Sequence, residues 1–100
     1  MRDLGVKDMF YVYIMASTSG VIYIGFTSDL VKRVWEHKNN LVDGFTKRYK
    51  CHKLVYYETG GDRDSTLNRE KQIKKWRRAK KTVLINSMNP KWEDLYNTII

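Results

Sequence analysis

The sequence predicts an α+β domain in which a three-stranded antiparallel sheet is flanked by helices. Two runs of β-branched and aromatic residues, 10–16 and 21–26, are separated by a short polar spacer that ends in glycine, as in a β-hairpin. A third run of this kind covers residues 53–59, and apolar residues recur at helical spacing in segments 29–39 and 62–81. Strands and helices in this order favour a sheet with helices packed on it.

The register of the hairpin determines which side chains share a face. The spacer at residues 17–20 fits a three-residue loop with Gly20 in the left-handed backbone region, which pairs Ser17 with Val21. In that register the odd-numbered residues of both strands lie on one face, because successive side chains alternate. The even-numbered residues then form an apolar core face, whereas the other face carries Tyr11, Tyr13, Met15, Tyr23 and Gly25. Tyrosines are also ordinary residues of half-buried strands.

The first helix is expected over residues 29–39. Asp29 and the two residues before it provide N-cap side chains, and apolar residues recur along one side: Leu30, Val31, Val34, Trp35 and Leu41. Arg33 and His37 lie one turn apart beside this stripe. We therefore expect both at the edge of the buried face, within reach of the tyrosines. The alternative is an exposed arginine and an ordinary histidine.

Residues 39–52 form a polar and basic connection with a turn at Asp43-Gly44. Its second half alternates cations with aromatic residues and includes Lys47, Arg48 and Tyr49. This pattern suits phosphate contact and base stacking, and it equally suits a solvated loop. The strand at 53–59 follows and is closed by Gly60-Gly61.

The second long helix is expected to begin at Asp62 or Asp64 and to run to Lys81. Its inward stripe consists of Leu67, Glu70, Ile73 and either Trp76 or Arg77. Glu70 thus stands among apolar residues, and a buried carboxylate is rare unless it is paired or bound to a metal. A salt bridge to Lys74 or to a lysine of the first helix is one explanation, and a metal ion is the other.

The outer side of this helix is basic, with Lys71, Lys74, Lys75, Arg78 and Lys81. Such a face suits nucleic acid, although many basic faces are simply solvated. A shorter apolar helix at 81–87 is expected next. Asn89-Pro90 ends it, and residues 92–97 close the domain.

Composition narrows the function classes further. One hundred residues suffice for one domain, which we place at 9–97 after a short polar extension at 1–8. A net charge of +8 and a pI near 9.7 favour a nucleic-acid partner rather than a membrane. The single cysteine cannot form an internal disulfide, and no run of about 18 apolar residues is present, so a cytoplasmic location is expected.

The ordered motifs resemble those of the GIY-YIG nucleases. The family's second motif is intact as Tyr23-Ile24-Gly25, and its first is similar to Tyr11-Val12-Tyr13, in which the glycine is replaced, as in the small stand-alone bacterial branch. Arg33 and His37 match the family's arginine and the histidine four residues later, and Glu70 matches its metal-binding glutamate. The resemblance covers residues 8–95, almost the whole chain.

This resemblance implies an endonuclease that depends on Mg²⁺ or Mn²⁺. Glu70 would hold the ion, Arg33 would bind the scissile phosphate, and Tyr13 would act as general base or orient the water. Tyr23 and His37 would supply supporting hydrogen bonds. A late asparagine also belongs to the family's site, with Asn89 the first candidate and Asn86 the alternative. A free phenol has a pKa of about 10, so Tyr13 needs cationic neighbours to act as a base.

DNA, including structured or damaged DNA, is the expected substrate ahead of RNA, and an unidentified protein partner could supply the targeting. We expect Gly25, which has no side chain, to leave space for substrate or water beside the phenol of Tyr13. Two rival classes remain. A nucleic-acid-binding module without turnover would use the same basic surface, and a protein-interaction domain would use the tyrosines as anchors but leave Glu70 unexplained.

Overall fold

A three-stranded antiparallel sheet in the order β2-β1-β3 forms the centre of the computed structural model, which describes residues 9–100. The strands are β1 (Phe10–Ala16), β2 (Ile22–Thr27) and β3 (Lys53–Gly60). The helices are α1 (Leu30–Lys38), α2 (Phe45–Tyr49), α3 (Arg63–Lys74), α4 (Arg78–Met88) and α5 (Tyr96–Ile99). The predicted α+β class is confirmed. The extension predicted at 1–8 lies outside the described residues.

The hairpin has the register that the sequence predicts. Tyr13 lies opposite Gly25, and Met15 lies opposite Tyr23. The backbone N–H of Ser17 donates to the carbonyl oxygen of Val21 at 2.8 Å, and Gly20 has a φ of +92°. The side chains of Tyr13 and Tyr23 therefore share one face of the sheet.

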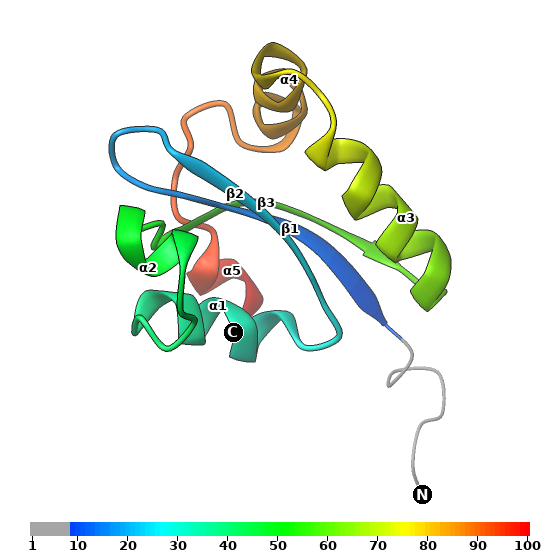
Figure 1. Ribbon diagram of the computed structural model, residues 1–100, viewed down its shortest axis with the longest axis horizontal. Helices are drawn as coiled ribbons and strands as arrows, with labels where there is room; N and C mark the ends of the chain where they lie inside the picture. Colours follow the sequence, from blue (N-terminus) through cyan, green and yellow to red (C-terminus); the bar gives the residue numbers. More distant parts are fainter. Residues whose placement is uncertain (1–8) are drawn as a thin grey trace, which may run out of the picture.

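Helices cover both faces of the sheet, α3 and α4 on one side and α1 and α5 on the other (Figure 1). The even-numbered side chains of β1 meet the first pair of helices in a cluster of Val12, Ile14, Ala16, Ile24, Val55, Tyr56, Ile73 and Ile85. The odd-numbered side chains meet the second pair in a cluster of Tyr13, Met15, Leu30, Val34, Cys51 and Leu54. The face with the tyrosines is thus a second core, and a site must open at an edge.

Helix α1 begins as expected, because the Asp29 side chain accepts a hydrogen bond from the backbone N–H of Lys32. The predicted apolar stripe is only partly right. Leu30 and Val34 are buried, whereas Val31, Trp35 and Leu41 are 39%, 48% and 61% exposed. The buried stripe continues through His37 instead, since positions i, i+4 and i+7 of this helix face the sheet.

Two features of the helices differ from the prediction. The basic connection folds into the short helix α2, and the second long helix ends at Lys74 rather than at Lys81. The helix breaks here because Trp76 packs against the core, with the guanidinium of Arg69 5.2 Å from its ring. The chain then turns, and α4 places Ile85 in the core. No glycine or proline marks this break in the sequence. Among residues 9–100, no helix combines the length and apolar composition needed to cross a membrane.

Candidate functional site

A buried chain of hydrogen bonds joins three elements at the centre of the candidate site. The hydroxyl of Tyr13 on β1 lies 2.8 Å from Nε2 of His37 on α1, and Nδ1 of His37 lies 2.9 Å from Oγ1 of Thr46 on α2. Each of these side chains is at most 2% exposed. When Nδ1–H donates to Thr46, Nε2 accepts from Tyr13, and in the other tautomer both bonds reverse. In either tautomer, Thr46 holds the orientation of the His37 ring.

Tyr23 on β2 lies beside this chain and is half-buried. Its ring centroid is 6.3 Å from that of Tyr13 and 5.5 Å from that of His37. The three rings thus form one aromatic group, with Tyr13 and His37 behind and Tyr23 toward the β2 edge of the sheet. The predicted sharing of one face by the two tyrosines places both phenols in this group.

Gly25 is needed because the ring of Tyr13 lies directly over it. A Cβ built at position 25 would fall 2.4 Å from the Tyr13 hydroxyl oxygen and equally close to the ring carbon that bears it. The sequence led us to expect free space for substrate or water at this point, and that expectation is wrong. The phenol of Tyr13 fills the space itself.

We expect Gly25→Ala to displace Tyr13 and to lower the free energy of unfolding by about 1–3 kcal/mol, the usual cost of overpacking a core. Urea unfolding measures this loss. Gly61→Ala is the matched control, because a Cβ there meets no atom within 4 Å. A Gly25→Ala protein as stable as the Gly61→Ala protein would contradict the close approach of Tyr13 to this glycine.

The phenol of Tyr13 is neutral in the free protein at neutral pH. Burial raises its pKa well above the ordinary value of 10.0, and the charges of Tyr23 and Glu70 raise it further. Arg33 lowers the pKa but is outweighed. The cationic neighbourhood that a tyrosine base would need is therefore supplied only in part.

His37 is also uncharged at neutral pH. Burial lowers its pKa to about 4, and the positive charges of Arg33 and His52 act in the same direction. The sequence placed His37 at the edge of the buried face, but the side chain is 1% exposed. A neutral imidazole with both nitrogens in hydrogen bonds can accept or pass on a proton.

The low pKa of His37 predicts that the protein loses stability in mild acid. Between the unfolded value of 6.5 and the folded value of about 4, the unfolded chain binds more protons, so the free energy of unfolding falls as pH falls. From pH 6.5 to pH 5 the loss is roughly 1.5 kcal/mol. Urea titrations at the two pH values measure it.

The chain contains two histidines, which gives this prediction a matched control. His37→Gln should remove most of the pH dependence of the unfolding free energy, whereas His52→Gln, which alters a partly exposed bond to Asn40, should keep it. An equal pH dependence in the wild type and in His37→Gln would refute the lowered pKa.

Arg33 lies at the edge of the buried face of α1, as the sequence predicts. Its guanidinium is 3.6 Å from the carboxylate of Glu36 one turn along α1, and its side chain is 40% exposed. Arg33 and Glu36 line a polar pocket of about 200 Å³ together with Thr27, Ser28, Asp29 and Lys32. An anion entering this pocket would compete with Glu36 for the guanidinium.

Glu70 approaches the same region from the opposite face of the sheet. It lies on α3, which packs against β1 and β2, and it is 6% exposed. Its Oε2 lies 2.6 Å from Nζ of Lys74, so the salt bridge that the sequence left open as one explanation is formed. The carboxylate is close enough to raise the pKa of Tyr13. Three side chains therefore converge around β2: Tyr13 lies over Gly25 of this strand, Arg33 lines a pocket with Thr27 at its end, and Glu70 lies on α3, which packs against it.

Comparison with known proteins identifies the family of this chain. The family described as the GIY-YIG catalytic domain matches residues 9–83, which contain both strands of the hairpin and α1 to α3. The chain belongs to the GIY-YIG family. The match includes each of the converging side chains.

The relatives of this chain are small proteins, and the region that matches covers nearly the whole of each one. UPF0213 protein SSP2268 of Staphylococcus saprophyticus is 35% identical over 79 residues, which cover 79% of this chain and 96% of that protein. A UPF0213 protein of Syntrophus aciditrophicus is 38% identical over 81 residues, which cover 80% of this chain and 92% of that protein. These relatives place the chain in a branch in which the GIY-YIG domain stands alone.

A solved structure shows the same fold. The solution NMR structure of the UPF0213 protein BH0048 from Bacillus halodurans matches with a TM-score of 0.56 at 24% sequence identity. The match covers 86% of this chain and 92% of that one. The sheet and helices described above are therefore those of a GIY-YIG fold.

The late asparagine expected of a GIY-YIG site serves the fold instead. Nδ2 of Asn89 donates to the carbonyl oxygens of Val55 and Glu93, and its Oδ1 accepts from the backbone N–H of Glu93. Val55 lies on β3, whereas the converging side chains surround β2 at the other edge. Asn86, the alternative, accepts a hydrogen bond from the indole of Trp92. Both amides thus fix the segment after α4.

The residues proposed for nucleic acid are exposed and are spread over α2, α3 and the start of α4. Lys47, Arg48 and Tyr49 lie on α2, whereas Lys71 and Lys74 lie on α3. Lys75 falls in the break after α3. Arg78 begins α4 and donates to the carbonyl oxygen of Gly20, so it supports the hairpin. Of these cations, Lys74 is the one that also touches Glu70.

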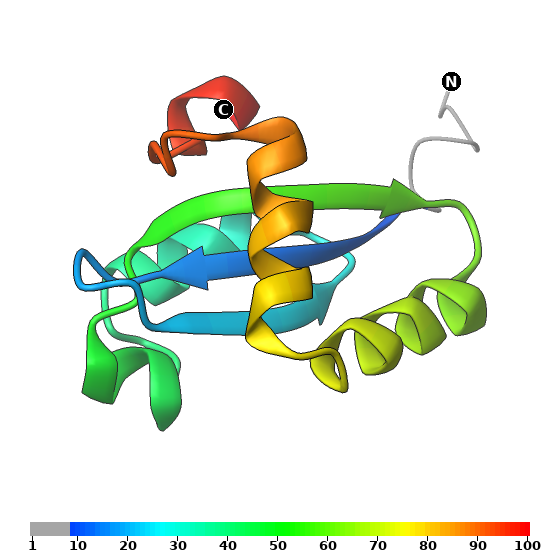
Figure 2. The ribbon, with the colours of Figure 1, turned by 90° about the horizontal axis from the view of Figure 1, so that it is seen from above.

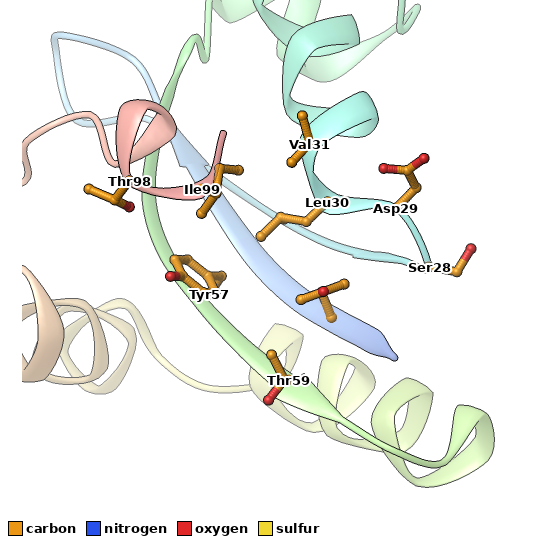
Figure 3. Close-up of a pocket in the computed structure, with 9 residues that line it drawn as sticks. Ser28, Asp29, Leu30, Val31, Tyr57, Thr59, Thr98 and Ile99 are labelled. Atoms are coloured by element: carbon orange, nitrogen blue, oxygen red, sulfur yellow. The ribbon is translucent and has the colours of Figure 1, made fainter. Parts of the chain in front are cut away.

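A second pocket of about 340 Å³ adjoins the polar pocket at Arg33, because Ser28 and Asp29 line both (Figure 3). It opens between the start of α1 and α5, over the tyrosine face of β1 and β3, and its lining includes Leu30, Tyr57 and Ile99. Its lining contains none of the side chains expected to be catalytic: Tyr13, Tyr23, Arg33, His37 and Glu70.

Sequence reasoning missed Thr46 and Glu36, the partners of His37 and Arg33. Thr46 had no signal of its own because it stands in a basic stretch without helical periodicity. Glu36 did have a signal in the sequence, because it follows Arg33 at i+3, a spacing that pairs opposite charges on a helix.

Proposed function

We propose that this GIY-YIG domain is a divalent-metal-dependent endonuclease that hydrolyses phosphodiester bonds in DNA. The observation that supports the proposal is that a hydrogen-bonded tyrosine and histidine, an arginine beside the end of β2 and a buried carboxylate on the helix that packs against β2 lie around one edge strand. Hydrolysis of a phosphodiester needs a positioned water, a proton acceptor and positive charge at the phosphate. These side chains offer each of the three.

Arg33 is the group for the scissile phosphate. Its guanidinium is partly exposed and lines a polar pocket beside the end of β2, so a phosphate can reach it. Guanidinium binds phosphate oxygens through paired N–H donors. The contact with Glu36 at 3.6 Å is long for such a bond and leaves the guanidinium available.

Tyr13 and His37 act as a pair on the attacking water. Because the Tyr13 phenol is neutral, it passes its own proton to Nε2 of His37 as its oxygen takes a proton from water. The product of this transfer is imidazolium, which the free protein disfavours because the pKa of His37 is about 4. An anionic phosphate bound nearby favours the imidazolium and so raises that pKa. Thr46 keeps the ring oriented throughout.

Glu70 suits a divalent cation that keeps most of its water ligands better than one that is enclosed by several protein side chains. Within residues 9–100, no cluster of three or more histidine, cysteine, aspartate or glutamate side chains is present to enclose a metal. Mg²⁺ is commonly held by one or two carboxylates together with waters and substrate phosphate oxygens. When bound, such an ion supplies charge neutralisation at the phosphate and the leaving oxygen. Lys74 would give up its place on Glu70 to the ion.

The test is a panel of labelled nucleic acids: blunt duplex, tailed duplex, branched DNA, single-stranded DNA, and the same single strand as RNA. Each is incubated with the purified protein in Mg²⁺, in Mn²⁺ and in chelator. We expect cleavage of at least one DNA and none with chelator. If no DNA of the panel is cut in either metal, the proposal is refuted.

One observation favours a second function, a nucleic-acid-binding module without turnover. Lys74 already neutralises Glu70 at 2.6 Å, so the carboxylate has a partner without any metal. Such a module would bind DNA with the strong salt dependence of phosphate contacts and leave it intact. Binding without cleavage across the panel would therefore select this function over the first.

A further inference from the structure

A groove beside β2 is built differently from the polar pocket at Arg33. It has a volume of about 310 Å³ and is lined by Ile22, Tyr23, Ile24, Phe45, Lys74 and Lys81. Aliphatic and aromatic side chains form most of its surface, and two lysines bring cations to it. Figure 2 shows β2 at the sheet edge, with α2 at one end and the junction of α3 and α4 farther along.

Aromatic rings continue from this groove along α2. The rings of Tyr23 and Phe45 are nearly parallel, with 6.3 Å between centroids and 29° between planes. Phe45 in turn lies 4.7 Å from Tyr49, and the guanidinium of Arg48 lies 5.5 Å from the Tyr49 ring. Phe45 is 44% exposed and Tyr49 is 43% exposed. The series therefore runs from the buried site to the surface.

Packing of the core does not explain these exposed rings. Both hydrophobic clusters are closed by other side chains, and neither includes Phe45 or Tyr49. Single exposed apolar residues are ordinary, but an aromatic series flanked by cations is the composition of a surface that stacks nucleic-acid bases. Every base has a π-face that can stack on phenylalanine or tyrosine, and the neighbouring lysines can meet its phosphates.

We infer that this groove binds an unpaired nucleobase of the DNA substrate, stacked on Phe45 beside the scissile phosphate. Tyr23 belongs both to the groove and to the catalytic group, which places the base next to the reacting bond. A base that is paired in a continuous duplex is already stacked on its neighbours and cannot enter. The enzyme is thereby directed to DNA with single-stranded nucleotides at the cleavage point. This inference rests on the proposed function for its location at the β2 edge.

The test measures binding rather than cleavage, in chelator and at one fixed salt concentration. The probes are a blunt duplex and the same duplex with a five-nucleotide single-stranded tail, either complete or abasic. We expect the complete tail to increase affinity about tenfold over the abasic tail, the scale of stacking one base. A 2-aminopurine in the complete tail should lose fluorescence on binding, because stacking on an aromatic ring quenches it.

Variants of Phe45 locate the effect. Phe45→Leu should lose the tenfold gain and the quenching, whereas Phe45→Trp, which keeps an aromatic face, should retain both. Trp35→Leu is the matched control, because Trp35 is 48% exposed on α1 and does not line the groove. Equal affinities for complete and abasic tails, or an unchanged gain in Phe45→Leu, would overturn the inference.

These results are separable from those that test the proposed function. Quenching and a tail preference without any cleavage in metal would support the base site and refute the nuclease. Cleavage in metal with no tail preference and no quenching would support the nuclease and refute the base site. Circular dichroism of Phe45→Leu confirms that the variant is folded, and its retained affinity for blunt duplex serves as a second check.

Discussion

Glu70→Gln should lower the rate of DNA cleavage on the order of a thousandfold and leave DNA binding nearly unchanged. The substitution keeps the size of the side chain but removes the negative charge that would hold the divalent ion. Losses of about this size follow when one charge-stabilising group is removed from an enzyme site. Affinity comes instead from many phosphate contacts on a protein of net charge +8. Single-turnover cleavage in Mg²⁺ and fluorescence anisotropy in chelator measure the two effects.

Glu93→Gln is the matched control for this charge change. Glu93 is exposed, and the hydrogen bonds it makes with Asn89 use only its backbone. This variant should cleave and bind as the wild type does. A Glu70→Gln protein that keeps its metal-dependent rate would show that the carboxylate does not hold the ion. A large loss of binding would assign Glu70 and Lys74 to the DNA surface instead.

Tyr13→Phe should reduce cleavage by roughly a hundredfold to ten-thousandfold, the range for loss of a proton-transfer group. The ring remains over Gly25, so packing is kept, but the hydroxyl that contacts His37 is deleted. Nε2 of His37 then lacks its buried partner, which costs about 1–3 kcal/mol of unfolding free energy. The protein should still fold. Single-turnover kinetics and urea unfolding measure the two losses separately.

Tyr11→Phe provides the comparison on the same strand. Tyr11 lies opposite Thr27 rather than Gly25, and it lines the pocket of about 340 Å³ near α5, which does not include Arg33. The Tyr11→Phe protein should cleave within about twofold of the wild-type rate, since the hydroxyl of Tyr11 contacts no reacting group. If both variants cleave at the wild-type rate, Tyr13 contributes its ring alone, and water must be activated by another group.

The sequence predicted the parts of the site that depend on strand alternation and helical spacing. Gly20 at the end of a three-residue loop set the hairpin register, and the register placed Tyr13 and Tyr23 on one face. The spacing of Glu70 and Ile73 on one stripe predicted a buried carboxylate. These relations are local, so neighbouring residues suffice to derive them.

The sequence did not predict relations that depend on how distant elements pack. Thr46 meets His37 only because a five-residue helix, too short for a periodic pattern, folds beside α1. The break between α3 and α4 follows from the packing of Trp76 against the core, and no helix-breaking residue signals it. Asn89 was assigned to the site by family resemblance, but its amide binds the backbone of β3 and the following loop.

The most direct test of the account compares the wild type with the double variant Tyr13→Phe/Glu70→Gln, purified by the same procedure. Both proteins are given the DNA that the panel shows to be cut fastest, in Mg²⁺ and in chelator, under single-turnover conditions. We predict that the wild type cleaves the DNA in Mg²⁺ and not in chelator, and that the double variant cleaves it in neither. Both proteins should bind the DNA. Equal cleavage by the two proteins would show that the activity does not arise from the side chains around β2, and would contradict the account.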